Sequence, residues 1–191
     1  MMVNRIMRYT VLLLIVSASL ACSGSGGARS ITSPGPSGSF VASFTADQSA
    51  PAAGEIGLSQ APGGGGDLVS LNVGVNGVSN LLGASFRVTY DPSLVEFDNW
   101  AAGSLIEGAG QSALYQVAIV QPGVVEVGVS CAACANGINV GATQNLVQLI
   151  FRATQSGSSP LTFVAADLLD SGSPPGPIGG LTWFGGTLVA N

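Results

Sequence analysis

The sequence predicts an all-β fold, in which roughly eight or nine short strands form an antiparallel β-sandwich. From residue 67 onward apolar side chains tend to occupy every second position, as in Val69, Leu71, Val73 and Val75. This period of two is typical of strands that bury one face. The 28 Gly and 10 Pro provide many turns. No segment keeps the period of 3.6 that a helix between parallel strands would need.

The expected strands follow each other closely along the chain. The first is ambiguous, because both 40–44 and 56–58 could form a short strand around the glycine turn at 63–66. The later strands are expected at 69–75, 86–90, 95–97, 115–119, 125–130, 147–153, 161–165 and 181–189. Gln121-Pro-Gly123 makes a tight turn between two of them. A jelly-roll arrangement would protect the edges of the sheets.

Residues 1–21 have the features of a secretory signal peptide. Two Arg precede a short apolar core at 11–16, and small residues follow it, which is too short for a transmembrane span. The ending Ser19-Leu-Ala-Cys22 resembles a bacterial lipoprotein box, although Ser19 stands where that family prefers an aliphatic residue. The resemblance implies that Cys22 is lipidated and becomes the mature N-terminus. The alternative is an ordinary signal peptide, cut nearby, with Cys22 incidental.

The segment 22–39 is rich in Ser, Gly and Pro, a composition typical of a flexible linker. The sequence therefore predicts a lipoprotein signal peptide at 1–21, a linker at 22–39 and one β-sandwich domain at 40–191. Each buried CH₂ of a lipid contributes about 0.8 kcal/mol, so two or three acyl chains on Cys22 would anchor the chain stably. The expected location is the outer membrane or the cell surface, and otherwise the protein is secreted.

The charge of the chain excludes several functions. After residue 21 it carries three Arg and ten carboxylates, 3 − 10 = −7, with no Lys and no His. An acidic chain of this kind lacks the basic surface that nucleic acid requires. The absence of His excludes Ser-His-Asp and Cys-His catalysis, and the acidic residues fall mostly in expected turns or on outward strand faces. We therefore expect no catalytic residues, no cofactor and no metal.

Two cysteines remain once Cys22 is set aside. Cys131-Ala-Ala-Cys134 has the spacing of a thioredoxin-type redox motif, but that chemistry needs a helix N-terminus and this motif follows the expected strand at 125–130. A zinc site would need two further good ligands. A small loop-closing disulfide is favoured, because an exported protein meets an oxidising compartment. Asp167 and Asp170 could bind Ca²⁺, but the favoured interpretation is that they are turn residues.

One stretch resembles a known family. Phe86-Arg-Val-Thr-Tyr-Asp-Pro-Ser-Leu-Val-Glu-Phe97 is similar to the corner between the third and fourth strands of the cohesin module. In such a corner Tyr90 would end one strand in the core, Asp91 would cap the turn and Pro92 would fix φ while the chain changes sheets. Further similarities, in the family's order and spacing, cover roughly 52–190. They lie at 66–67, 101–105, 149–153 and 183–189.

The resemblance implies a nine-stranded jelly-roll sandwich that binds a dockerin-type protein module through one flat sheet face and catalyses nothing. It also implies a context of polysaccharide degradation. Carried over by position, that face consists of Ser85, Arg87, Thr89, Gln116, Ala118, Glu126, Gly128, Ser130, Thr162 and Val164, which we call the candidate face. Its most suggestive member is Arg87, since Arg is enriched at interaction hot spots.

Alternatives remain open at this stage. The candidate face could be no more than a solvated outer surface. The module could also bind polysaccharide, as a carbohydrate-binding module on the cell surface, and then Trp100 and Trp183 are the candidate Trp of an exposed aromatic platform. A purely structural role in the cell envelope is a further possibility.

Overall fold

Two packed β-sheets make up the part of the chain that the computed structural model describes, residues 40–191. The predicted signal peptide, the linker at 22–39 and Cys22 lie outside the described residues. The elements are β1 (Ala42–Ala46), β2 (Glu55–Gln60), β3 (Leu68–Asn76), β4 (Val78–Thr89), β5 (Val95–Ala102), α1 (Ser104–Gly108), β6 (Ala113–Gln121), β7 (Val124–Cys131), β8 (Ile138–Val140), β9 (Gln144–Ala153), β10 (Gly157–Asp170), β11 (Thr182–Phe184) and β12 (Gly186–Ala190).

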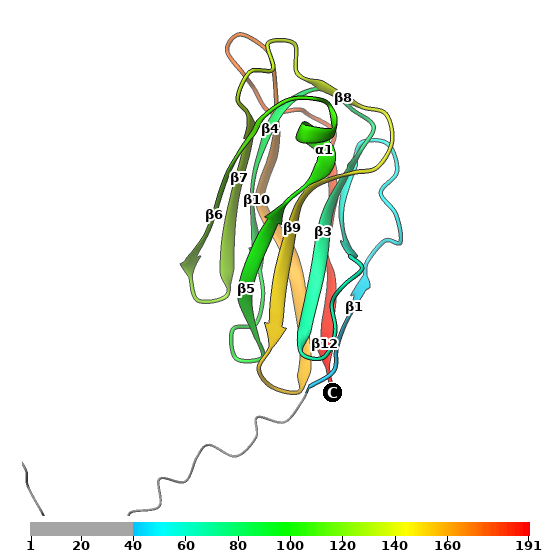
Figure 1. Ribbon diagram of the computed structural model, residues 1–191, viewed down its shortest axis with the longest axis vertical. Helices are drawn as coiled ribbons and strands as arrows, with labels where there is room; N and C mark the ends of the chain where they lie inside the picture. Colours follow the sequence, from blue (N-terminus) through cyan, green and yellow to red (C-terminus); the bar gives the residue numbers. More distant parts are fainter. Residues whose placement is uncertain (1–39) are drawn as a thin grey trace, which may run out of the picture. The chain divides into compact units, whose positions relative to one another are not determined.

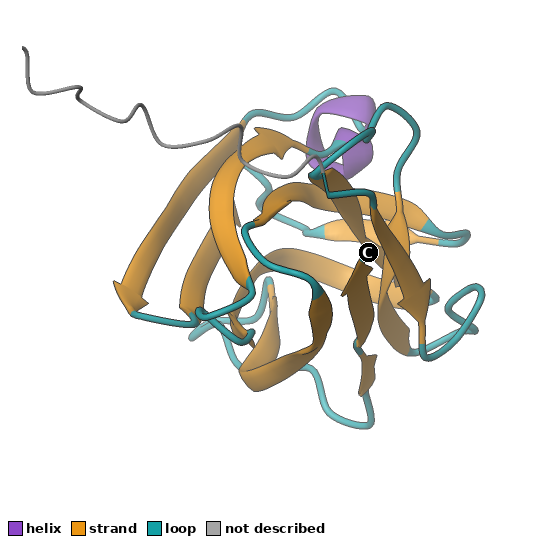
Figure 2. Cartoon of the chain, turned by 90° about the horizontal axis from the view of Figure 1, so that it is seen from below, coloured by secondary structure: helices purple, strands orange, loops and turns teal. Residues whose placement is uncertain are grey.

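The two sheets form the layers of a sandwich (Figures 1 and 2). One has the order β1-β12-β10-β4-β7-β6, with β8 paired to β4, and the other has the order β11-β2-β3-β9-β5. All pairings are antiparallel except the short one between β11 and β2. The predicted all-β antiparallel sandwich is therefore confirmed.

The strands are more numerous than the sequence pattern suggested. Both candidate first strands form, as β1 and β2, and a three-residue β8 is added. The single strand expected at 181–189 is divided into β11 and β12 at Gly185, and the two halves join different sheets. Gly185 packs so closely on the carbonyl oxygen of Leu161 that a Cβ would clash with it. A residue without a side chain is therefore required where the chain crosses between sheets.

Alternation along the strands builds the core between the sheets. The four apolar residues of β3 at 69, 71, 73 and 75 are fully buried, as are Phe86 and Val88 of β4 and Phe151 of β9. Tyr90 and Phe97 each meet Phe151 edge to face, with ring centroids 5.4 Å and 5.6 Å apart, an arrangement that aromatic pairs prefer. The period of two thus identified the buried face correctly.

The Tyr-Asp-Pro corner connects β4 of one sheet to β5 of the other. The N–H of Tyr90 donates to the carbonyl of Gly123 (2.9 Å). Oδ1 of Asp91 accepts hydrogen bonds from the N–H (2.9 Å) and the hydroxyl (2.6 Å) of Ser93. These bonds hold the pKa of Asp91 below its ordinary value. Asp91 therefore caps the turn that the sequence predicted.

A short helix follows β5, where the sequence pattern showed no helical period. Strand β5 runs on to Ala102, beyond the expected end at residue 97, and α1 then buries Leu105 and Ile106. Five residues are too few to show a helical period in the sequence. Within residues 40–191 no helix is both long and apolar enough to cross a membrane.

Candidate functional site

The ten residues of the candidate face lie on four neighbouring strands of one sheet, in the order β10, β4, β7 and β6. Cross-strand pairing places Val164, Arg87, Glu126 and Ala118 in one row across these strands. Their side chains alternate with the buried residues of the same strands, so all point away from the core. Seven of the ten are exposed, whereas Thr89, Glu126 and Gly128 are half-buried. The structure thus brings the sequence-derived residues together on one outer surface.

An ion pair occupies the middle of the candidate face. Nη2 and Nε of Arg87 both lie 2.6 Å from Oε2 of Glu126, and the two residues are directly opposite each other on β4 and β7. Their side chains are 48% and 43% exposed. A surface pair of this kind contributes between about 0 and 1 kcal/mol to stability. Arg87 therefore presents a partly neutralised guanidinium, and the sequence alone did not show this pairing.

Three residues beside the candidate face were missed by the sequence reasoning. Leu114 of β6 is 61% exposed and lies opposite Ser130, and Leu169 of β10 lies opposite Gly83 in the same row. Asp167, which the sequence placed in a turn, lies instead within β10 and opposite Ser85. Leu114 alternates in step with Gln116 and Ala118, so the alternation along β6 could have identified it from the sequence. The two residues of β10 follow a β-bulge after Val164, which shifts the alternation.

The two leucines border a shallow hollow at one end of the candidate face. Its lining includes Leu114, Gly128, Ser130 and Leu169. Gly83 forms part of the row between them, and a Cβ there would clash with the carbonyl oxygen of Val129. Gly83 is therefore needed for the close approach of β4 to β7, while the leucines give the hollow an apolar rim.

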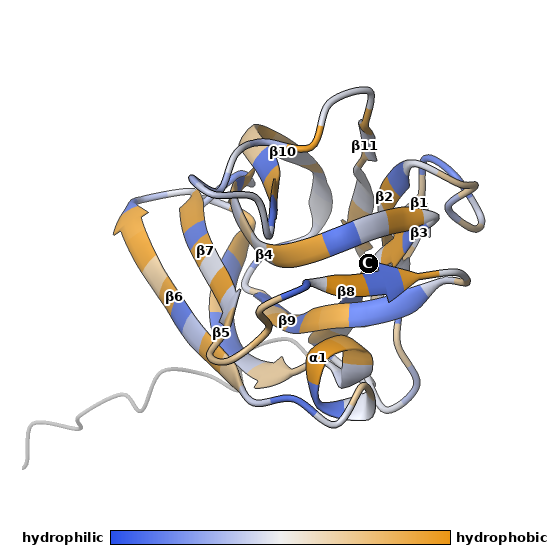
Figure 3. Cartoon of the chain, turned by 90° about the horizontal axis from the view of Figure 1, so that it is seen from above, coloured by the Kyte–Doolittle hydropathy of each residue, from blue (hydrophilic) through white to orange (hydrophobic). Residues whose placement is uncertain are grey.

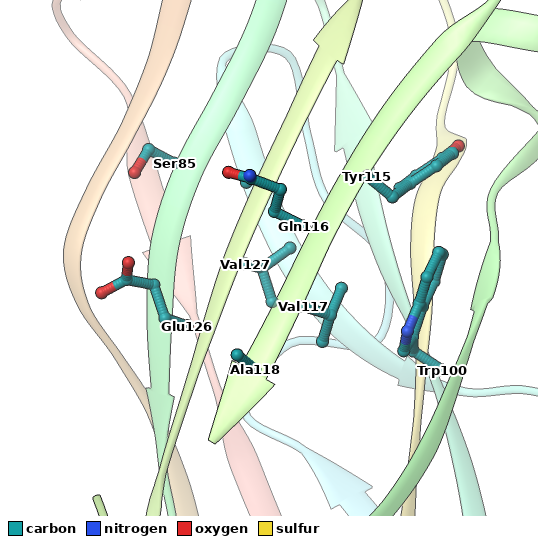
Figure 4. Close-up of a pocket in the computed structure, with 9 residues that line it drawn as sticks. Ser85, Trp100, Tyr115, Gln116, Val117, Ala118, Glu126 and Val127 are labelled. Atoms are coloured by element: carbon teal, nitrogen blue, oxygen red, sulfur yellow. The ribbon is translucent and has the colours of Figure 1, made fainter. Parts of the chain in front are cut away.

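The candidate aromatic platform for carbohydrate is not formed. Trp100 and Tyr115 pack on the opposite side of β6 from Gln116 and Ala118 (Figure 4), with ring centroids 5.2 Å apart and planes inclined by 36°. Trp183 packs against Phe86 and Phe163 at 5.6 Å and 5.0 Å. Both Trp are half-buried against the core. Sugar platforms need exposed, coplanar rings, so these residues act as packing residues.

Tyr115 is tied to the neighbouring backbone. Its hydroxyl lies 3.4 Å from the carbonyl oxygens of Gly103 and Leu146. Burial raises the pKa of Tyr115, so the hydroxyl remains a donor at neutral pH. The hydroxyl therefore links β6 to the backbone before α1 and to β9.

The remaining polar residues have structural roles. Cys131 and Cys134 form a disulfide with a Cα–Cα distance of 5.6 Å, and both are buried. Oδ1 of Asp170 accepts the N–H groups of Gly172 and Gly176 at 3.0 Å each, which lowers its pKa. Asp170 is therefore a turn residue. Among residues 40–191 no three His, Cys, Asp or Glu side chains gather as metal ligands would.

The fold and the flat outer face define a β-sandwich binding module. A family model for the cohesin domain matches residues 55–173, and the chain belongs to the cohesin family. Cohesin domains are non-catalytic protein-docking modules. The resemblance in the Tyr-Asp-Pro corner is thereby confirmed.

Solved structures with the same fold include several cohesins. The third cohesin ScaC of Acetivibrio cellulolyticus, in complex with the ScaB dockerin, is 18% identical with a TM-score of 0.55, covering 70% of this chain and 95% of that chain. The sixth cohesin of scaffoldin B from the same organism, in complex with a Cel5 dockerin, is 17% identical (TM-score 0.53; 75% and 96% covered). The seventh ScaB type I cohesin of Pseudobacteroides cellulosolvens is 15% identical (TM-score 0.53; 70% and 88% covered). No curated protein matches the chain.

Proposed function

We propose that this cohesin domain docks a dockerin-type protein module through the candidate face. The observation that carries the proposal is the assembly of all ten candidate residues on one outer surface of β10, β4, β7 and β6. Two of the similar cohesins were solved in complex with dockerins. A docking role also agrees with the non-catalytic character of the family.

The chemistry of the candidate face suits a partner that lies flat on it. Ser85, Ala118 and Gly128 are small and let a partner element approach the sheet closely, while exposed apolar side chains flank them at Leu114 and Val164. Burial of the two apolar side chains would supply affinity. The ion pair between Arg87 and Glu126 would supply orientation more than affinity, since desolvation offsets much of its Coulomb energy.

The two Arg of residues 40–191 provide a matched test. Arg87 lies on the candidate face, whereas Arg152 lies on the other sheet. The purified protein would capture partners from the secretome of its host, and calorimetry would measure their affinity. We expect Arg87→Gln to weaken a dockerin-bearing partner about 10-fold or more and Arg152→Gln to leave its affinity unchanged. Equal effects of both variants, or binding to insoluble polysaccharide alone, would contradict the proposal.

We further propose that the protein is exported and held to the cell envelope through lipid on Cys22. The lipoprotein-type ending of the signal peptide supports this location, and the composition of 23–39 supports a flexible spacer. A flexible linker of this length spans roughly 20 Å on average, which would lift the candidate face off the membrane. The domain would then hold its partner, for which we propose a polysaccharide-degrading enzyme, at the surface of the cell.

A further inference from the structure

Strand β6 (Ala113–Gln121) lies at the end of its sheet. It pairs with β7 on one side, and no other strand within residues 40–191 pairs with its second side. The N–H of Ala132 donates to the carbonyl of Ser112 at 2.9 Å. Counting from Ser112, every second residue of β6 therefore exchanges backbone hydrogen bonds with β7. The backbone N–H and C=O groups of the residues between them point away from β7. The backbone N–H and C=O groups of Tyr115, Val117 and Ile119 consequently face the open edge.

Little in β6 protects this edge, because its one irregularity is a bulge between Ile119 and Gln121, near the end of the strand. Natural proteins blunt an edge strand with charges, Pro, bulges or short length, because unpaired N–H and C=O groups invite another strand. β6 has nine residues, Ala-Leu-Tyr-Gln-Val-Ala-Ile-Val-Gln, with no charge, no Pro and no Gly. It also holds three of the five large exposed apolar side chains among the described residues, Leu114 (61%), Ile119 (54%) and Val120 (50%). Figure 3 shows the strand as largely hydrophobic at the border of its sheet.

The other edge strands are protected in the usual ways. β11 has three residues and β1 has five, and β5 carries Glu96 and Asp98. β6 differs from these edge strands, because it is long and uncharged and its only interruption is the bulge near its end.

We propose that β6 pairs antiparallel with β6 of a second copy of the chain, about a two-fold axis at Val117. In this register Tyr115 lies opposite Ile119 of the other copy and Gln116 opposite Ala118, so the paired residues precede the bulge that follows Ile119. The strand is thus complementary to itself in size and polarity, which an isologous interface requires. Both copies are acidic, but β6 carries no carboxylate, and the nearby Glu126 is paired with Arg87. Repulsion at the contact is therefore small.

The pairing leaves the candidate face open. Residues that lie opposite each other on paired strands project to the same side of a sheet. The outer faces of the two copies would therefore lie side by side on one continuous sheet, and the dimer would present two candidate faces. Dimer formation and partner docking can accordingly be measured separately, so the failure of one does not imply the failure of the other.

Sedimentation velocity over a concentration series of the purified protein tests the pairing. We expect a monomer–dimer equilibrium that Ile119→Lys abolishes, since a charge at the edge opposes strand addition. The matched control is Val41→Lys, which also replaces an exposed apolar residue (64%) and adds the same charge, next to β1 at the other end of the sheet. This control should dimerise like the unmodified protein. A monomer at every concentration, or a dimer that persists in Ile119→Lys, would overturn the proposal.

Amide hydrogen exchange followed by NMR tests the register without any substitution. The amides of Tyr115, Val117 and Ile119 should exchange quickly in dilute protein and more slowly as the concentration rises. The amides of Gln116 and Ala118, which already bond to β7, should be protected at all concentrations. Protection of the first set that does not depend on concentration would show that residues of the same chain cover the edge, and it would overturn the proposal.

Discussion

Arg152 joins three strands of the five-stranded sheet at a single residue. Its guanidinium lies 2.7 Å from Asp67, 2.8 Å from Asp98 and 3.4 Å from Glu96. Hydrogen bonds to Asp98 and then to Asp67 raise its pKa above the ordinary value. The cluster thus ties β9 to β5 and to the start of β3, and three of the chain's carboxylates are explained without a catalytic role.

We expect Arg152→Gln to lower the free energy of unfolding at low ionic strength, because it removes a network of exposed ion pairs. Urea unfolding at low and high salt would measure the loss. It should shrink at high salt, because salt screens exposed charges. Arg87→Gln removes a single ion pair, so it should lower the free energy of unfolding less than Arg152→Gln does. A loss that salt leaves unchanged would mean that packing of the Arg152 side chain, and not its charge, matters.

The environment of Asp170 leads us to expect that stability depends on pH in a definite direction. Hydrogen bonds from Gly176 and Gly172 hold its pKa below the ordinary value of 3.8. The carboxylate therefore contributes stability above the unfolded pKa, and this contribution is lost as the pH falls through the folded pKa. We expect Asp170→Ala to lower the thermal midpoint at neutral pH, and we expect this difference to shrink as the pH falls into the acid range. The exposed Asp167→Ala is the control, and an equal gap at neutral and at acid pH would contradict the assignment.

At the scale of elements, one buried hydroxyl connects the corner after β4 to β10. Ser159 is fully buried, and its Oγ accepts the N–H of Asp91 at 2.9 Å. Ser159→Ala would leave that N–H without a partner, which costs about 1–3 kcal/mol. Chemical denaturation would measure the cost, and the exposed neighbour Ser158→Ala should change little. An unaltered stability of Ser159→Ala would mean that water reaches the N–H of Asp91.

The disulfide after β7 closes a short loop. Cys131 and Cys134 are separated by three positions, so the cross-link restricts the unfolded chain only modestly, by about 2 kcal/mol. We expect the double variant Cys131→Ala/Cys134→Ala to fold and to lose about that much free energy of unfolding in urea. The unmodified protein, unfolded in urea in the presence of a reductant, should show nearly the same free energy of unfolding as the double variant. Failure of the double variant to fold would show that the two sulfurs are needed to pack the core.

At the scale of the whole molecule, alternation of apolar residues was sufficient to predict the sandwich and the outward parity of β4, β6 and β7. It was insufficient where a contact depends on register between distant strands. The pairing of Arg87 with Glu126 joins positions 39 apart, and no local pattern fixes that register. Asp167 and Leu169 were missed because the bulge at Ala165, which has a positive φ of 47°, interrupts the alternation. The open edge of β6 likewise depends on strand order, which the sequence pattern does not contain.

We propose that Cys22 determines the location of the whole protein, and Cys22→Ser tests this proposal directly. In the full chain expressed in its host, lipidation requires the thiol, so the variant should lose labelling by a fatty-acid probe. It should also move from the membrane fraction to the soluble fraction, because acyl chains supply the anchoring energy. Affinity for a partner should not change, since the candidate face belongs to residues 40–191. A matched Ser23→Ala variant should stay with the membrane. If Cys22→Ser also stayed there, Cys22 would be incidental and the signal peptide an ordinary one.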